Sequence, residues 1–377
     1  MRRFVTIGSG VGALVALAVM LGAIVTGTGD DGTDAPPSVF PAGSLTVGLQ
    51  DARLSTGSPA LIPARIALLA STGVTVTRVD VRWLEIASTK PARGADPNDP
   101  AYTWDRLDAV IDGLAAKGIQ AVVDVSGAPT WANGGKGPEW SPNVEDYGAF
   151  MHALATRYDG TAHGAVRLYE PWNEPNDPLS LMPQWNSATG QAIPASPALY
   201  AALLTRAYAE VKAAAPDAEV VGLAVGHVEA SAPPSGGVSV VDFVQGLIPS
   251  KPPMDTVSVH IAATGAPSAA SDAVPSLGSL PRLSRELHRL ASDAPIYVTQ
   301  LGYRTGPGGF SEADQAAYLS QALQRLATAA DIRLVIWDVL QDAPDRTSGL
   351  LRVDGAQKPA WAAFTTGPKV LPSRSGP

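Results

Sequence analysis

The chain has 377 residues, of which 45% are hydrophobic, so it is long enough to bury the core of one large α/β domain. Its formal net charge of −8 argues against nucleic acid as a partner. It contains no cysteine, which excludes disulfides, thiolate metal sites and cysteine nucleophiles. Its five histidines lack metal-ligand spacing, so we expect neither a metal nor another cofactor.

The N-terminal segment differs in composition from the rest of the chain. A basic start, Met1 to Arg3, precedes an apolar run from Phe4 to Val25. Residues 1–28 therefore predict either a cleaved secretory signal or an uncleaved membrane anchor. Both alternatives place the protein outside the cytoplasm, secreted or on the outer face of the cytoplasmic membrane, with this segment as its only membrane contact. Residues 29–44, rich in Asp, Gly and Pro, predict a flexible linker.

Residues 45–368 follow one repeating pattern, and residues 369–377 are predicted to be a disordered tail. Eight apolar runs are each followed by a helical stretch, which predicts a parallel sheet closed into a single (β/α)8 TIM barrel. The runs begin at Leu45, Val74, Ile119, Val166, Ala218, Thr256, Pro295 and Ile332. The segments that follow the strands are the long ones, so we expect the active face at the carboxyl ends of the strands.

Side-chain alternation predicts which residues point into the barrel, because the outward faces of barrel strands lie under apolar helices. The residues predicted to point inward are Arg78, Asp80 and Arg82, then Val122 and Asp124, then Ser258 and His260, then Val298 and Gln300, and finally Val335 and Trp337. Asp338 has the opposite parity to Trp337 and is predicted to point away.

One motif carries most of the functional information. Residues 169–176 read Tyr-Glu-Pro-Trp-Asn-Glu-Pro-Asn after an apolar strand, which fixes Glu174 at a strand end beside an amide and aromatic residues. This stretch resembles the fourth-strand signature of the clan of retaining glycoside hydrolases (clan A) that includes families 5 and 39, of the cellulase and xylosidase type. The resemblance, which extends from Leu45 to Phe364, implies that Glu174 is the acid/base and that Asn173 binds the sugar 2-hydroxyl.

Glu170 lies deeper in the predicted barrel than Glu174. A bare carboxylate is costly to bury there, so we expect Arg78 and Arg82 to compensate its charge. Arg78 also resembles the arginine that the clan keeps near its nucleophile. Arg78 is therefore interpreted either as a site residue that contacts substrate or as part of a core ion pair.

The seventh strand departs from the clan's pattern. Residues 295–303 resemble the clan's seventh-strand motif, but Gln300 stands where that motif has its nucleophilic glutamate. An amide cannot form the glycosyl-enzyme ester, and without the neighbouring anion Glu174 should ionise more readily. Ala262 similarly replaces the tyrosine that contacts the nucleophile. Glu229 and Asp124 remain possible replacements for the missing carboxylate.

Sugar-binding residues are better preserved. Trp337 matches the tryptophan on which the clan stacks its sugar, and Trp131, Trp140 and Trp185 lie in segments of the same predicted face. His260 is interpreted either as a cleft residue or as a buried histidine with satisfied hydrogen bonds.

Two functions fit these patterns. The first is an exported hydrolase of O-glycosyl bonds in a β-linked oligosaccharide, polysaccharide or other glycoside, with its retaining activity impaired by Gln300. The second is a pseudoenzyme, a catalytically inactive glycan-binding barrel at the cell surface.

Overall fold

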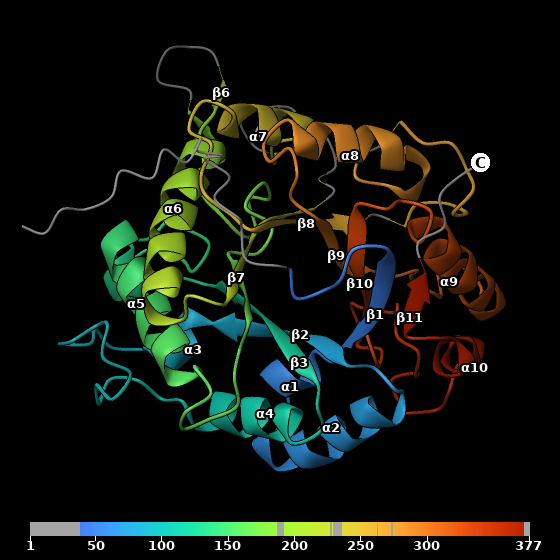
Figure 1. Cartoon of the computed structure of the whole chain (residues 1–377), viewed down its shortest axis with the longest axis horizontal. Helices are drawn as coiled ribbons and strands as arrows, with labels where there is room; N and C mark the ends of the chain where they lie inside the picture. The colour runs from blue at the N-terminus through green and yellow to red at the C-terminus, as the bar shows by residue number, and fades with distance from the viewer. Residues whose placement is uncertain are drawn as a thin grey trace, which may run out of the picture. The chain divides into compact units, whose positions relative to one another are not determined.

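The structure is a computed structural model that describes residues 38–186, 192–226, 228, 236–261, 263–272 and 274–372. These residues form one compact unit, in which a ring of helices surrounds a central sheet (Figure 1). The predicted signal or anchor lies outside the described residues. No helix in the described part is long and apolar enough to span a bilayer.

Eight parallel strands follow one another around the sheet in chain order. Each strand is hydrogen-bonded to the next one in the series, except that β1 is not hydrogen-bonded to β2. The first and last strands, β1 and β10, pair with each other. This topology is that of a TIM-like α/β barrel. The eight are β1 (Ser44–Gln50), β2 (Val76–Arg82), β3 (Gln120–Ser126), β4 (Leu168–Pro171), β7 (Glu219–Val225), β8 (Thr256–Ile261), β9 (Ile296–Leu301) and β10 (Ile332–Asp338). A separate pair is formed by β5 (Trp185–Asn186) and β6 (Ile193–Pro194).

Helices connect successive strands on the outside of the sheet (Figure 1). The main helices are α2 (Ile62–Ser71), α4 (Asp105–Ala115), α5 (Val144–Arg157), α6 (Ser196–Ala214), α7 (Val240–Leu247), α8 (Leu280–His288), α9 (Glu312–Leu326) and α10 (Pro359–Thr366). Shorter turns are α1 (Arg53–Thr56), η1 (Pro59–Leu61), α3 (Trp83–Ile86), η2 (Thr130–Ala132) and η3 (Leu277–Ser279). The eight strand–helix units predicted from the apolar runs are present.

The core has two parts because alternate strand residues face opposite ways. A small cluster lies on the face of the strands that Arg78 also faces and fills the barrel interior, with Val76, Val122 and Leu168 among its members. A much larger cluster, with Val79 and Val81 among its members, lies between the strands and the helices. This second layer contains most of the buried hydrophobic residues.

The amino-terminal approach to β1 is packed into the barrel, which corrects the predicted linker. Phe40 is 6% exposed and meets the ring of Tyr297 edge-on, with centroids 5.4 Å apart. The Ser38 hydroxyl is 2.7 Å from the Tyr297 hydroxyl. Residues 38–44 are therefore part of the folded unit, and the flexible linker that we predicted from residue 29 does not extend through them.

The carboxyl-terminal segment also joins the sheet. β11 (Val370–Pro372) pairs antiparallel with Ser44–Thr46 of β1, so these three residues are not part of a disordered tail. Further along β1, the contact with β2 is made by a side chain, since Thr77 Oγ1 of β2 donates to the Leu49 backbone carbonyl of β1 at 2.7 Å. Gly48 allows this approach, because a Cβ there would lie 2.8 Å from the Val76 carbonyl oxygen.

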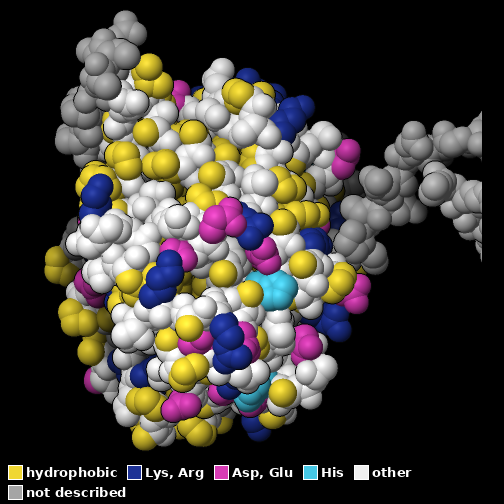
Figure 2. Space-filling model, turned by 90° about the vertical axis from the view of Figure 1, so that its left-hand side faces the viewer, with side chains coloured by type: hydrophobic (Ala, Val, Ile, Leu, Met, Phe, Trp, Pro, Cys, Tyr) yellow, Lys and Arg dark blue, Asp and Glu magenta, His cyan; other side chains and the backbone are white. Residues whose placement is uncertain are grey.

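The outer face over α5 and α6 carries acidic and basic side chains interspersed among hydrophobic ones (Figure 2). Arg206 of α6 is 2.9 Å from carboxylate oxygens of both Glu145 and Glu210, and His152 is 2.8 Å from Glu210. Exposed pairs of this kind stabilise a fold only weakly.

Candidate functional site

A cavity of about 770 Å³ opens at the carboxyl ends of β8, β9 and β10 and is bounded by Glu174 after β4. This is the face on which the sequence placed the site. The polar side chains that line the cavity include those of Glu174, His260, Gln300, Asp338, Arg346 and Arg304.

Glu174 lies just after β4 in a tight turn, with a positive φ of 40°. Its Oε1 accepts a 2.7 Å hydrogen bond from Nδ1 of His260, a β8 residue that is 4% exposed. Burial raises the pKa of Glu174, but the hydrogen bond and electrostatic interaction with His260, together with the positive charges of Arg78 and Arg346, outweigh it, so the pKa lies below its ordinary value. Glu174 is therefore set up to be an ionised carboxylate at neutral pH.

Gln300 reaches the same cavity through an irregularity in β9. Between β8 and β9 the register shifts after Val259 and Val298, so that His260 lies opposite Gln300. Val298 belongs to the outer core, contrary to its predicted inward direction. Gln300 nevertheless lines the cavity, and its Nε2 donates to Asp338 Oδ2 at 3.3 Å.

Asp338 points into the cavity, so the predicted parity of β10 is wrong. Leu334 and Ile336 are the interior residues of this strand, and Asp338 continues their face. Arg346 forms an ion pair with the Asp338 carboxylate, and its Nε donates to Oδ2 at 3.1 Å. Burial raises the pKa of Asp338, and Arg346 only partly offsets this, so the pKa lies above its ordinary value.

Trp337 lies on the opposite face of β10 and is 1% exposed. Its ring stacks on Tyr303 with centroids 6.2 Å apart, and its indole N–H donates to the Ser348 carbonyl at 3.1 Å. Trp337 is thus a core residue and not the sugar platform that the resemblance implied. Carrying the alternation through from Leu334 and Ile336 would have identified Asp338 instead.

Arg78 is the centre of a buried ion-pair cluster inside the barrel. The guanidinium, on a residue that is 2% exposed, lies 2.7 Å from Asp80, 3.1 Å from Asp124 and 2.7 Å from Glu170. It also donates to Asn173 Oδ1 at 2.7 Å, which orients that amide. Of the two interpretations of Arg78, a substrate-contacting residue or a member of a core ion pair, the structure therefore supports the core ion pair.

The Arg78 cluster sets the charge states of its carboxyls. Burial raises the pKa of Glu170, but Arg78, His260 and the hydrogen bonds from Ser258 and Arg78 together outweigh it, so the pKa lies below the ordinary value. Asp124 is buried beside Arg78 and Glu170, and burial raises its pKa above the ordinary value. Asp124 is occupied by this cluster, and it does not line the cavity as a replacement carboxylate. Arg82 was expected in the cluster, but its side chain is 48% exposed and pairs with Glu85, so that prediction is wrong.

The tryptophans of the loops have structural partners outside the cavity. Trp131 donates to the Ala87 carbonyl at 2.8 Å and packs edge-on against Trp83. Trp185 donates to the Gly236 carbonyl at 2.6 Å. Neither these residues nor Trp140 lines the cavity as described, whereas Phe310, which the sequence analysis missed, does.

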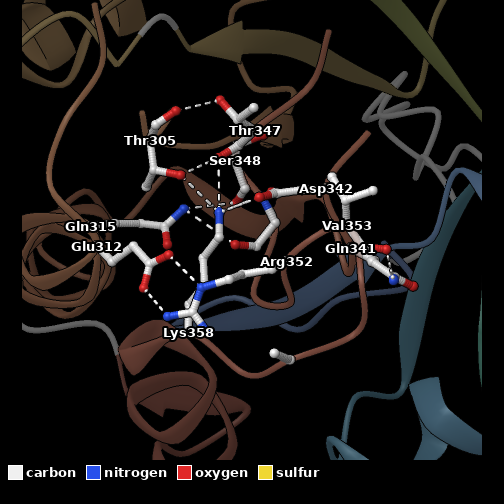
Figure 3. Close-up of polar contacts among 12 residues, drawn as sticks. Thr305, Glu312, Gln315, Gln341, Asp342, Thr347, Ser348, Arg352, Val353 and Lys358 are labelled. Carbon is white, nitrogen blue, oxygen red and sulfur yellow. Dashed lines mark hydrogen bonds and ion pairs between the residues drawn. The ribbon is translucent and has the colours of Figure 1, made fainter. Parts of the chain in front are cut away.

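A buried lysine fixes the loop that carries Arg346. Lys358, which is 2% exposed, places its amine 2.7 Å from Asp342 and 2.9 Å from the Thr305 hydroxyl (Figure 3). It also donates to the Thr347 carbonyl at 3.1 Å. The β9–α9 and β10–α10 loops are thereby joined next to the cavity.

Two predicted positions lie outside the described residues. They are Ala262, interpreted as standing in place of a tyrosine, and Glu229, a possible replacement carboxylate. Among the described residues, no group of His, Asp and Glu side chains is arranged to hold a metal ion.

Comparisons with known proteins identify the fold. The family model described as Cellulase (glycosyl hydrolase family 5) matches residues 42–216. A comparison with curated proteins found no match.

Solved structures are similar over most of the chain. A family 39 glycoside hydrolase from Bacteroides cellulosilyticus WH2 is 20% identical with a TM-score of 0.61, over 85% of this chain and 62% of that one. This chain thus spans less than two thirds of that enzyme's length. A monomeric β-xylosidase from Caulobacter crescentus CB15 is 20% identical with a TM-score of 0.56, over 85% of this chain and 67% of that one. GH5_18 from Streptomyces cattleya, solved in complex with GlcNAc, is 15% identical with a TM-score of 0.60, over 86% of this chain and 80% of that one. The protein therefore has the TIM-like barrel fold of these glycoside hydrolases.

Proposed function

We propose that this protein binds a β-linked glycoside in the cavity beside Glu174, and that its retaining hydrolysis of O-glycosyl bonds is impaired. The observation that carries the proposal is that Glu174 and Gln300 line one cavity, with the Gln300 amide hydrogen-bonded to Asp338. A retaining site needs two carboxyl groups on either side of the scissile bond. Here one of the two positions holds a neutral amide.

The protonation state of Glu174 supports the same conclusion. A general acid must carry a proton at the working pH, which requires a raised pKa. The pKa of Glu174 is instead lowered, mainly by His260 acting against the effect of burial. Glu174 would therefore donate a proton to a leaving oxygen inefficiently at neutral pH, and both halves of the retaining reaction are weakened.

The glycan-binding alternative is favoured by the shape and chemistry of the cavity. A volume of about 770 Å³ lies within the range of small-molecule sites. Phe310 supplies an aromatic ring for the C–H face of a sugar, and Arg304, Asp345 and Thr264 supply polar groups for its hydroxyls. The amide of Gln300 preserves nearly the shape of a glutamate while removing its nucleophilic oxygen.

We further propose that the protein acts outside the cytoplasm, on the basis of the basic start and apolar run in residues 1–28. N-terminal sequencing of the protein recovered from the cell surface and from the medium tests this. A cleaved start near residue 28 indicates a signal peptide, and an intact start at Met1 in the membrane fraction indicates an anchor. Recovery only from the cytoplasm would contradict export.

The test of function measures binding and turnover separately. We expect titration calorimetry to detect binding of one or more members of a panel of β-linked oligosaccharides. We expect aryl β-glycosides to be hydrolysed slowly or not at all. The Phe310→Ala variant should weaken binding, whereas Gln321→Glu, an exposed change on α9, should leave it unaltered. If the parent protein hydrolyses these glycosides rapidly, and Glu174→Gln abolishes the hydrolysis, the proposed impairment of catalysis is refuted. Absence of binding across the panel would refute the sugar site.

A further inference from the structure

Gln300 and Asp338 come from adjacent strands and form a direct contact in the cavity. The Gln300 Nε2 lies 3.3 Å from Asp338 Oδ2 and donates its hydrogen to that oxygen. Asp338 is 5% exposed, and Ser348 Oγ also donates to Oδ2 at 3.3 Å. The Gln300 amide is therefore held in place by a buried carboxylate.

A glutamate at position 300 would meet Asp338 as a like charge. Glutamate has the shape of glutamine, so one of its oxygens would replace Nε2 about 3.3 Å from Asp338 Oδ2. Two carboxylates at that separation cannot both ionise readily, because each raises the pKa of the other. One proton would be shared between them, and a protonated carboxyl is a poor nucleophile.

The cation that contacts this pair is already engaged. Arg346 contacts both Asp338 oxygens and also donates to Gln50 Oε1 at 3.1 Å. The other charged or titratable groups that influence Asp338 or line the same cavity are Asp80, His260, Glu174, Arg304 and Asp345. Three of these five are acidic, so the surroundings would not offset a second carboxylate next to Asp338.

We infer that Asp338 is a second determinant of the impaired site, because its carboxylate fixes the Gln300 amide and excludes an ionised carboxylate from position 300. The inference rests on the proposed function, in which position 300 is that of the nucleophile. It assigns Asp338 as a positioning residue. Restoring a nucleophile then requires changes at both positions.

The first experiment needs no sugar. The pKa of the introduced carboxyl is measured by carbon-13 NMR in Gln300→Glu and in Gln300→Glu/Asp338→Asn, each labelled at glutamate and compared with the labelled parent. We expect the pKa to be about 1–3 units higher in the single variant than in the double variant. The control Gln300→Glu/Asp345→Asn, which neutralises an exposed cavity carboxylate, should resemble the single variant.

Equal pKa values in Gln300→Glu and Gln300→Glu/Asp338→Asn would overturn the inference. Because Asp338→Asn leaves Arg346 without its ionic partner, thermal unfolding is measured for each variant. If the asparagine variant does not fold, Gln300→Glu/Asp338→Ser serves for the same comparison. Since no ligand is involved, this result is independent of whether the cavity binds sugar.

The second experiment measures nucleophilicity with an activated aryl 2-fluoro-β-glycoside. In the step under test, an oxygen of the introduced carboxylate bonds to the anomeric carbon while the bond to the aryloxide breaks, and the electron pair leaves with the aryloxide. We expect mass spectrometry to show covalent labelling at least about tenfold faster in Gln300→Glu/Asp338→Asn than in Gln300→Glu, and none in the parent. Equal labelling of both variants, or labelling of neither, would overturn the inference. Loss of sugar binding by the parent would instead refute the proposed function.

Discussion

Replacing Arg78 by methionine should destabilise the barrel strongly. The change keeps a long apolar side chain but removes the cation from Asp124 and Glu170, whose side chains are 1% and 0% exposed and lie 3.1 and 2.7 Å from the guanidinium. Removing one partner of a buried ion pair costs about 3–5 kcal/mol, because the remaining charge is buried without compensation. We expect a loss of that size in the free energy of unfolding at neutral pH, measured with urea.

The loss should depend on pH with a definite sign. Without Arg78 the two carboxyls have higher pKa values in the folded state than in the unfolded state, so they bind protons more tightly when folded. The difference between Arg78→Met and the parent should therefore be smaller at about pH 5 than at about pH 8. Arg82→Met is the matched control, since Arg82 is exposed and its pair is worth at most about 1 kcal/mol. A loss below about 1 kcal/mol for Arg78→Met, or one that does not shrink on acidification, would refute this reasoning.

Three further predictions concern single side chains. The pKa of Glu174 is lowered in the folded state, so the ionised carboxylate stabilises the fold above its unfolded pKa, and this effect is lost as the pH falls through the folded pKa. The parent's free energy of unfolding should therefore exceed that of Glu174→Gln by less at about pH 3 than at about pH 7. A difference that grows on acidification would contradict the lowered pKa. Lys358→Met leaves the Asp342 carboxylate buried without its cation and should cost about 3–5 kcal/mol, visible as a lower melting temperature, whereas an unchanged melting temperature would show that the ion pair contributes no net stability. Trp337→Phe should cost about 1–3 kcal/mol of stability but leave the sugar dissociation constant unaltered, and weakened binding at unchanged stability would show that Trp337 contacts the ligand.

The order of strands and helices was predictable from the sequence because each apolar run is short, bounded by polar residues and followed by a helical pattern. The directions of Arg78, Asp124 and His260 also followed from alternation, since their strands are regular up to these residues. The same rule failed in β9 and β10 for two reasons. The register shift in β9 changes the alternation between Val298 and Gln300, and no sequence signal marks it.

In β10 the alternation was started from the wrong residue, so Val335 and Trp337 were predicted to point inward in place of Leu334 and Ile336. Both faces of a barrel strand are apolar near its start, so Leu334 and Val335 cannot be told apart by hydrophobicity alone. This error hid Asp338 and Arg346, which contact Gln300 or its partner. The interactions of the loop tryptophans were likewise unreadable, because they depend on carbonyl groups far away in the chain, such as those of Ala87 and Gly236.

The pairing of β11 with β1 has a consequence for solubility. Where the first two strands of a barrel are not hydrogen-bonded to each other, the first strand has an edge with free backbone donors and acceptors. Such an edge is a template for pairing with another molecule. In this protein the last described residues, Val370–Pro372, cover part of that edge, and the strand ends in a proline that cannot donate a further ladder hydrogen bond. We therefore expect Val370–Pro372 to reduce intermolecular pairing at this edge, and a chain ending at Gly367 to present the edge of β1 to neighbouring molecules.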